Sequence, residues 1–278
     1  MPWTASSGNT YRLCLLDTNA ISEIIKNPRN EGMGFVKKFG PDGHVPCITI
    51  YSIIELRRKK DLFQQYIEFF SNYPSFLIKP IEMLFREEQK SINGSQSVNA
   101  LMHAFSPLGQ DNSYALNNFI NQIFDDPVIE SYEKNWRANE YNILEIWDKN
   151  KVNFSPTRSE ANAQDAERFV DEAGLQFLIG HFPKWTKIEL NAGRVPRVAD
   201  FPSLQVSLYS IYYRMFDANW KQQPQEVTDL RIIAAAPYVD VIITEKFQAE
   251  ILRKIKSRVP TIQNLKITKL KDIRWENM

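Results

Sequence analysis

Short apolar runs alternate with stretches of helical spacing over roughly the first third of the chain. The run at 11–16 is nearly all apolar and ends at Asp17, which is typical of a strand buried on both faces of a parallel sheet. Thr49 can cap the longest stretch of helical spacing. The predicted order is strand 11–16, helix 20–26, strand 45–48, one long helix 50–70, strand 76–80 and helix 81–88. This alternation predicts an α/β fold with a mostly parallel sheet.

The middle of the chain, residues 93–199, does not continue this alternation. It begins with a polar stretch and contains a Pro-broken polar stretch at 155–163. Helical spacing occurs at 119–124, 131–149 and 166–179. We interpret the segment as a mainly helical insertion into an α/β core formed by residues 1–92 and 200–278.

Regular patterning returns after residue 200. The predicted elements are helix 204–215, helix 228–236, strand 241–244, helix 247–257 and edge strand 265–270. The stretch 241–244 is β-branched, and the stretch 265–270 alternates between apolar and polar residues. The second part of the core therefore also combines helices with strands.

The composition indicates a folded protein with a large core. Of 278 residues, 43% are hydrophobic and 12% aromatic, which excludes a disordered chain. The 34 Lys and Arg residues nearly balance the 33 Asp and Glu residues, so a phosphate-binding surface would have to be a local patch. Cys14 and Cys47 lie in apolar stretches and are interpreted as reduced core cysteines. Neither a signal-peptide order nor an apolar run of roughly 20 residues is found, so we expect a soluble, cytoplasmic protein.

Four acidic residues are predicted to lie near the carboxyl ends of parallel strands, where such sheets bind ligands. Asp17 and Glu245 each follow a predicted strand, and ligands of open parallel sheets bind beyond the carboxyl ends of the strands. Asp229 lies in the predicted first turn of the helix before the second of these strands, and Glu55 lies near the start of the helix after strand 45–48. Each acid alone is equally well explained as a helix cap or a solvated side chain. Together they can form an oxygen-only site for a hard divalent cation.

Four motifs, in order, resemble those of PIN-domain nucleases, the group that includes VapC-type toxins. The motifs lie at Leu15–Glu23, Ile48–Leu56, Asp229–Ala236 and Val241–Glu245. The resemblance implies a three-layer α/β/α fold and a nuclease that hydrolyses phosphodiester bonds with Mg²⁺ or Mn²⁺. It also implies that Asp17, Glu55 and Asp229 bind the metal, with Asn19 and Thr244 orienting carboxylates or water molecules.

The last motif departs from the family pattern. Many members have an acid two residues after the threonine, and this chain has Lys246 there. Glu245, one residue after Thr244, can substitute as a catalytic acid. Asp240 is a poorer candidate because it precedes the strand, roughly 15 Å from Glu245 at the usual strand rise.

Nucleic acid, with RNA favoured by the resemblance alone, is the expected partner. Arg57, Arg58 and Lys59 follow Glu55 directly and are candidates for contacts to phosphate, although solvated helix faces are the commoner role of such runs. Aromatic residues of the insertion can stack on unpaired bases or form its core. They are Trp136, Tyr141, Trp147, Phe177 and Trp185.

Two alternatives stay open. The first is a PIN-like module without catalysis that serves as a scaffold or an RNA-binding subunit, which Lys246 favours. The second is a toxin or defence effector that is held inactive by an inhibitory protein partner. A homodimer also stays open, and no membrane partner is expected.

Overall fold

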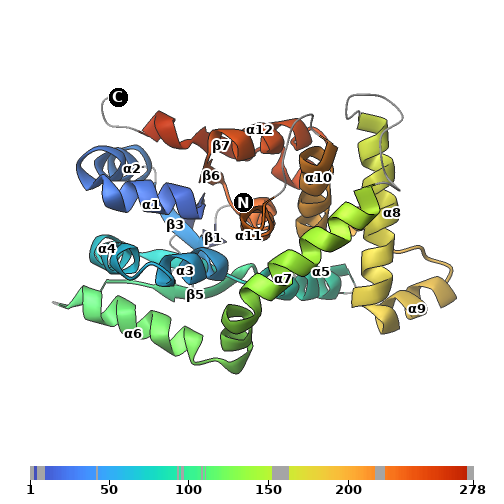
Figure 1. Cartoon of the computed structure of the whole chain (residues 1–278), viewed down its shortest axis with the longest axis horizontal. Helices are drawn as coiled ribbons and strands as arrows, with labels where there is room; N and C mark the ends of the chain where they lie inside the picture. Colours follow the sequence, from blue (N-terminus) through green and yellow to red (C-terminus); the bar gives the residue numbers. More distant parts are fainter. Residues whose placement is uncertain are drawn as a thin grey trace.

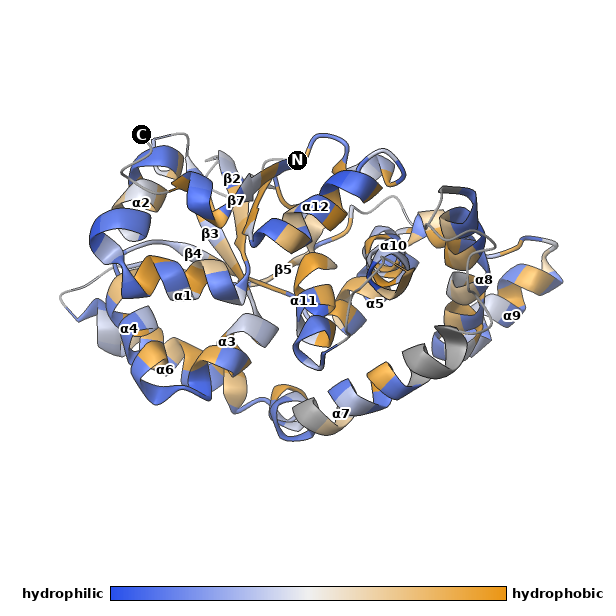
Figure 2. Ribbon diagram, turned by 45° about the horizontal axis from the view of Figure 1, so that its top comes forward, coloured by the Kyte–Doolittle hydropathy of each residue, from blue (hydrophilic) through white to orange (hydrophobic). Residues whose placement is uncertain are grey.

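The protein is an α/β structure in which helices cover both faces of a mostly parallel sheet (Figure 1). The computed structural model describes residues 3–4, 10–41, 43–92, 94, 97–107, 109, 111–151, 163–216 and 223–273. Figure 2 shows α1, α2 and α4 on one side of the sheet and α5, α10, α11 and α12 on the other. This arrangement confirms the predicted three-layer α/β/α fold class.

The sheet has the strand order β5-β4-β3-β2-β6-β7, with β1 pairing antiparallel to β2. All other pairs are parallel except β4 with β5. The strands are β1 (Trp3–Thr4), β2 (Thr10–Leu16), β3 (His44–Thr49), β4 (Ser75–Ile78), β5 (Leu101–Phe105), β6 (Val241–Thr244) and β7 (Lys266–Lys269). From β2 the chain first builds the sheet toward β4 and later, through β6, toward β7. The boundary between β2 and β6 is therefore a switch point, where open α/β sheets bind ligands.

The helices that follow the first strands mostly lie where the pattern predicts them. They are α1 (Thr18–Lys26), α2 (Met33–Phe39), α3 (Ile50–Arg57), α4 (Lys60–Phe70) and α5 (Ile81–Ile92). The single long helix predicted over 50–70 is wrong, since the chain bends at Arg58 and Lys59. Almost all of α3 is buried, whereas α4 buries one stripe of residues. A single straight helix could not be surrounded by the core at one end and lie on its surface at the other.

The segment 93–199 is mainly helical, and it also supplies a strand. Its helices are α6 (Asn112–Phe124), α7 (Pro127–Lys151), α8 (Ala163–His181) and α9 (Pro183–Asn191). Neither α9 nor β5 is predicted by the sequence pattern. The strand β5 has only Phe105 fully buried and pairs antiparallel with β4, so the open edge of the sheet determines its conformation. The division into a core and an insertion stays a prediction, and residues 155–162 of the Pro-broken stretch lie outside the described residues.

The C-terminal part completes the sheet. Its elements are α10 (Pro202–Phe216), α11 (Gln225–Ile233), a 3-10 turn (Ala236–Tyr238), β6, α12 (Lys246–Ile255) and β7. The helix predicted to begin at Thr228 begins at Gln225, which moves Asp229 from the first turn to the second. It also ends at Ile233, before the predicted end at Ala236. The predicted strand 241–244 is confirmed at both ends.

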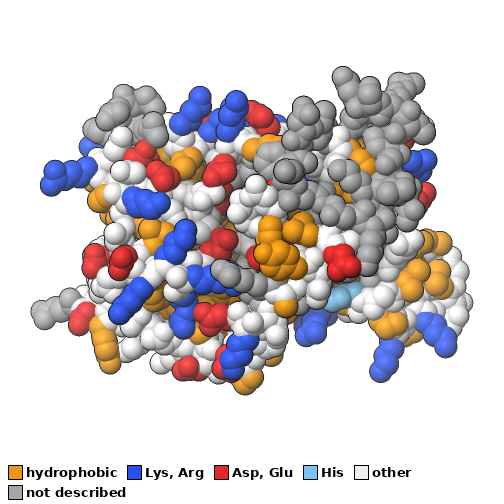
Figure 3. All heavy atoms as spheres, viewed as in Figure 1, with side chains coloured by type: hydrophobic (Ala, Val, Ile, Leu, Met, Phe, Trp, Pro, Cys, Tyr) orange, Lys and Arg blue, Asp and Glu red, His pale blue; other side chains and the backbone are white. Residues whose placement is uncertain are grey.

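The core runs along both faces of the central strands. Cys14 and Cys47 are fully buried in it as free thiols, as predicted. Among the described helices, none combines the length and the apolarity needed to cross a bilayer. Figure 3 shows acidic and basic side chains intermixed over the half of the surface that carries α1 to α4.

Candidate functional site

Asp17 lies at the switch point and joins β2 to β6. It is the residue after β2 and the N-cap of α1, where its Oδ1 accepts a hydrogen bond from the Ala20 amide at 2.6 Å. Its Oδ2 accepts from the Thr244 hydroxyl and from the Glu245 amide, the latter at 3.2 Å. The parallel pairing of Leu16 with Ile243 brings these groups together. Both oxygens are thus held in place by the protein.

Glu55 reaches the same edge of the sheet from α3. The Thr18 hydroxyl, in the first turn of α1, donates a hydrogen bond to Glu55 Oε2. Because Thr18 is adjacent to Asp17, this contact brings Glu55 to the chain segment that carries Asp17. Glu55 is half-buried and so keeps some access to solvent.

Asp229 is held by a buried arginine that sequence reasoning missed. Arg214 on α10 is 1% exposed, and its Nη2 lies 3.5 Å from Asp229 Oδ2. Its Nη1 lies 2.9 Å from Oε2 of Glu226, which is 3% exposed, and Nη2 also donates to Gln248. The one sequence signal is an arginine inside a helix whose other residues are mostly apolar.

Glu245 contacts Asn19 across the opening of the site. Asn19 Nδ2 donates to Glu245 Oε1 at 2.5 Å, and both side chains are exposed. Lys246 begins α12 and points to an exposed position. Asp240 lies at the other end of β6, where its Oδ2 accepts from the Leu13 amide at 2.8 Å, so it does not belong to the site.

A further acid comes from the middle segment. Glu140 on α7 is 5% exposed, and its Oε1 accepts from the Thr228 hydroxyl at 2.6 Å. The negative charge of Glu140 is one cause of the raised pKa of Glu55. No local pattern distinguishes Glu140 from the other acids of α7, so its role could not be predicted from the sequence.

The charges of neighbouring acids help to raise the pKa of each of the three predicted ligands. The pKa of Asp17 is raised to about 7 by burial and by the charges of Asp229 and Glu245, against hydrogen bonds from Thr244 and Ala20 that lower it. Burial and the charge of Asp229 raise the pKa of Glu55 to about 7. Burial and the charge of Glu245 raise the pKa of Asp229 to about 6, although Arg214 lowers it. The acids therefore form one cluster in which negative charge is unfavourable.

The donor chemistry of the cluster fits a hard divalent cation. Carboxylate oxygens are the ligands that Mg²⁺ and Mn²⁺ prefer, and a cation would offset the repulsion between the acids. The side chains are not grouped for direct coordination, because no set of three or more Asp, Glu, His or Cys among the described residues is arranged to hold an ion. Magnesium usually retains several water molecules and needs only one or two carboxylates, which these positions can supply.

The three predicted nucleic-acid contacts differ in exposure, since Arg57 is half-buried whereas Arg58 and Lys59 are exposed. Arg57 lies against α6 and α7, with its guanidinium 4.2 Å from the Phe124 ring centre and its Nε 3.4 Å from Glu133. Its charge is therefore used within the protein. Arg58 and Lys59 are exposed at the bend between α3 and α4, close to Glu55.

The aromatic residues of the middle segment mostly pack in the protein. Phe177 stacks on His181 with ring centres 5.0 Å apart, and Trp185 packs edge-on against Phe201 at 5.5 Å. Tyr141 is 62% exposed. The side chains of Trp136 and Trp147 lie outside the described residues.

Comparison of the chain with protein-family models, with curated proteins and with solved structures gave no match. The arguments for a function therefore rest on the site itself and on the resemblance of the motifs.

Proposed function

We propose that the protein is a cytoplasmic, Mg²⁺- or Mn²⁺-dependent nuclease of the PIN type that hydrolyses phosphodiester bonds, with RNA as the favoured substrate. The observation that supports this most is the acid cluster at the switch point. Asp17, Glu55 and Asp229 come from three distant parts of the chain, and their pKa values are raised by burial and by the neighbouring acids. Buried acids of this kind are concentrated in functional sites.

In this proposal Asp17, Glu55 and Asp229 bind the metal, directly or through water. The bound ion supplies Lewis-acid chemistry that polarises the phosphodiester and lowers the pKa of the attacking water. The hydroxyls of Thr18 and Thr244 keep two of the carboxylates in position. Asn19 does the same for Glu245.

The exposed Arg58 and Lys59 contact phosphates of the substrate beside the cluster. Such contacts position a strand without reading its sequence. Arg57 does not contribute in this way, since its guanidinium is engaged with α6 and α7.

A cleavage assay tests the proposal. End-labelled single-stranded RNA and DNA are incubated with the wild-type protein and Mg²⁺ or Mn²⁺, with and without a chelator. Asp17→Asn and Glu55→Gln should each abolish cleavage, as should the chelator. Glu88→Gln is the matched control, because Glu88 is also a buried acid with a pKa raised to about 7, but it binds Ser203 and Tyr238 instead of the cluster. Cleavage that persists in Asp17→Asn contradicts the proposal.

One observation favours a second candidate function, that of a PIN-like scaffold or RNA-binding subunit without catalytic activity. Arg214 supplies a fixed positive charge beside Asp229, which a metal would supply in an enzyme. A protein that binds labelled RNA in a gel-shift assay, yet cleaves neither RNA nor DNA with any divalent metal, is this scaffold. Its RNA binding should then be unchanged in Asp17→Asn and weakened in a double Arg58→Ser, Lys59→Ser variant.

A further inference from the structure

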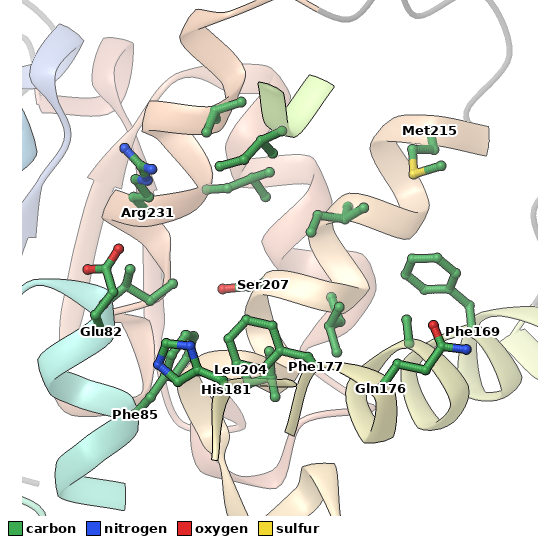
Figure 4. Close-up of a pocket in the computed structure, with 17 residues that line it drawn as sticks. Glu82, Phe85, Phe169, Gln176, Phe177, His181, Leu204, Ser207, Met215 and Arg231 are labelled. Atoms are coloured by element: carbon green, nitrogen blue, oxygen red, sulfur yellow. The ribbon is translucent and has the colours of Figure 1, made fainter. Parts of the chain in front are cut away.

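A large cavity lies outside the acid cluster, between α5, α7, α8, α10 and α11. Its volume is about 620 Å³, within the range of small-molecule sites. The wall is mainly apolar and includes Phe85, Phe169, Phe177, Leu204 and Met215 (Figure 4). The cavity is partly open to solvent, so a small molecule can enter it, and its apolar wall offers water few hydrogen bonds.

Among the described residues, Glu82 and Arg231 are the two charged residues of the cavity wall, which also includes the polar side chains of Gln176, His181 and Ser207. In Figure 4, Glu82 and Arg231 lie together at one side, while Phe169 and Met215 lie at the opposite side. Tyr51, which is fully buried, donates a hydrogen bond from its hydroxyl to Glu82 Oε2 at 3.0 Å, and the Arg231 guanidinium lies 5.5 Å from the Tyr51 ring centre. The position of both charges is therefore fixed by the same aromatic side chain.

The two charges decide what kind of ligand fits. Glu82 and Arg231 have opposite signs, so their end of the cavity carries no net charge from this pair. An ionised head group of either sign would lose its hydration there without a net countercharge, which is unfavourable. A neutral hydroxyl or amide can donate to Glu82 and accept from Arg231 at the same time.

We propose that this cavity binds an uncharged, mainly apolar small molecule with one hydroxyl or amide group, which lies between Glu82 and Arg231. The apolar part of the ligand fills the space toward Phe169 and Met215. The proposal does not depend on nuclease activity, because the cavity shares none of its lining residues with the acid cluster.

Binding is tested directly with a fluorescent probe. N-phenyl-1-naphthylamine is neutral, apolar and brighter in apolar surroundings, so its emission should rise on addition of the protein. 1-Decanol should displace the probe at a concentration about tenfold lower than decanoate, since only decanoate carries the unfavourable charge. An absence of enhancement, or equal displacement by the alcohol and the acid, overturns the proposal.

Two variants locate the probe. Ala173→Phe fills the cavity from α8 and should weaken probe binding about tenfold or more, with Ala173→Leu in its place if the larger variant does not fold. Ala192→Phe is the matched control, because Ala192 is exposed at the end of α9 and outside the cavity. Probe binding that is equal in the Ala173 variant and the wild type contradicts the proposed position.

A third variant tests the end of the cavity that carries Glu82 and Arg231. Glu82→Gln removes the negative charge and leaves Arg231, so decanoate should gain about tenfold relative to 1-decanol. Thermal unfolding of each variant confirms that it is folded. An unchanged order of the two competitors in Glu82→Gln would show that Glu82 does not face the ligand.

Discussion

The substitution Arg214→Met tests how strongly the buried arginine stabilises the protein. Arg214 is 1% exposed, its partner Glu226 is 3% exposed, and the two are joined by a contact of 2.9 Å. Methionine retains an apolar stem of similar length and removes only the guanidinium. Glu226 would then be a buried charge without its cation. Removal of one member of a buried ion pair costs about 3–5 kcal/mol, which is a large part of the stability of an ordinary domain.

Urea unfolding followed by circular dichroism measures this loss. Arg197→Met is the matched control, because Arg197 pairs with Asp200 at 2.7 Å while its side chain is 73% exposed. An exposed pair contributes at most about 1 kcal/mol, so the control should unfold close to the wild type. The double variant with Glu226→Gln should recover much of the loss, since it removes the isolated charge.

The reasoning is refuted by either of two results. The first is an Arg214→Met protein that loses no more stability than Arg197→Met. The second is a double variant that is as unstable as the sum of its single variants, which would mean that Arg214 and Glu226 do not interact.

Three further predictions concern other parts of the molecule. Burial raises the pKa of Glu88 to about 7, so the folded state binds the proton more strongly than the unfolded state does. The free energy of unfolding should therefore fall as pH rises from about 4.5 to about 7. In urea unfolding, Glu88→Gln should remove this pH dependence and be more stable than the wild type at pH 8 by up to about 3 kcal/mol. Gly174→Ala should lower the free energy of unfolding by more than about 1 kcal/mol, because the added Cβ would lie 2.1 Å from Val198. In the same helix, the Cβ of Gly180→Ala would meet nothing within 4 Å, so this control should raise the free energy of unfolding by up to about 1 kcal/mol. A similar effect of both substitutions would contradict the packing argument. Millimolar Mn²⁺ should raise the melting temperature of the wild type but not of Asp17→Asn, and an equal rise in both would place the metal elsewhere.

The fold class and the edge that carries the site could be predicted because their signals are local. The buried strand before Asp17 and the β-branched strand before Glu245 can each be recognised from a few consecutive residues. Two strands of one parallel sheet place their carboxyl ends at the same edge. Asp17 and Glu245 could therefore be predicted to lie at one edge without knowledge of how the residues between them fold. The structure has this geometry, with β2 and β6 adjacent and parallel.

The features that could not be predicted depend on contacts between distant residues. The bend at Arg58 arises because α3 is buried on nearly all sides and α4 on only one, which depends on how α1 and α6 pack. The strand β5 takes its conformation from the open edge of β4. Glu140 and Arg214 are ordinary charged residues in the sequence, and only the packing of α7 and α10 against α11 brings them to the cluster.

Arg214 and Glu140 change the balance of charge around the acids of the candidate site. Arg214 lies nearer to Glu226, at 2.9 Å, than to Asp229, at 3.5 Å, so much of its charge is already offset by Glu226. The negative charge of Glu140 also acts on Glu55. The protein therefore leaves the cluster with more negative than positive charge, which is consistent with the raised pKa values of Asp17, Glu55 and Asp229. Near neutral pH only bound protons or an external cation can remove this excess, and a divalent cation does so while keeping the carboxylates ionised. The charge of Arg214 beside Asp229, on which the scaffold alternative rests, therefore does not by itself balance the cluster.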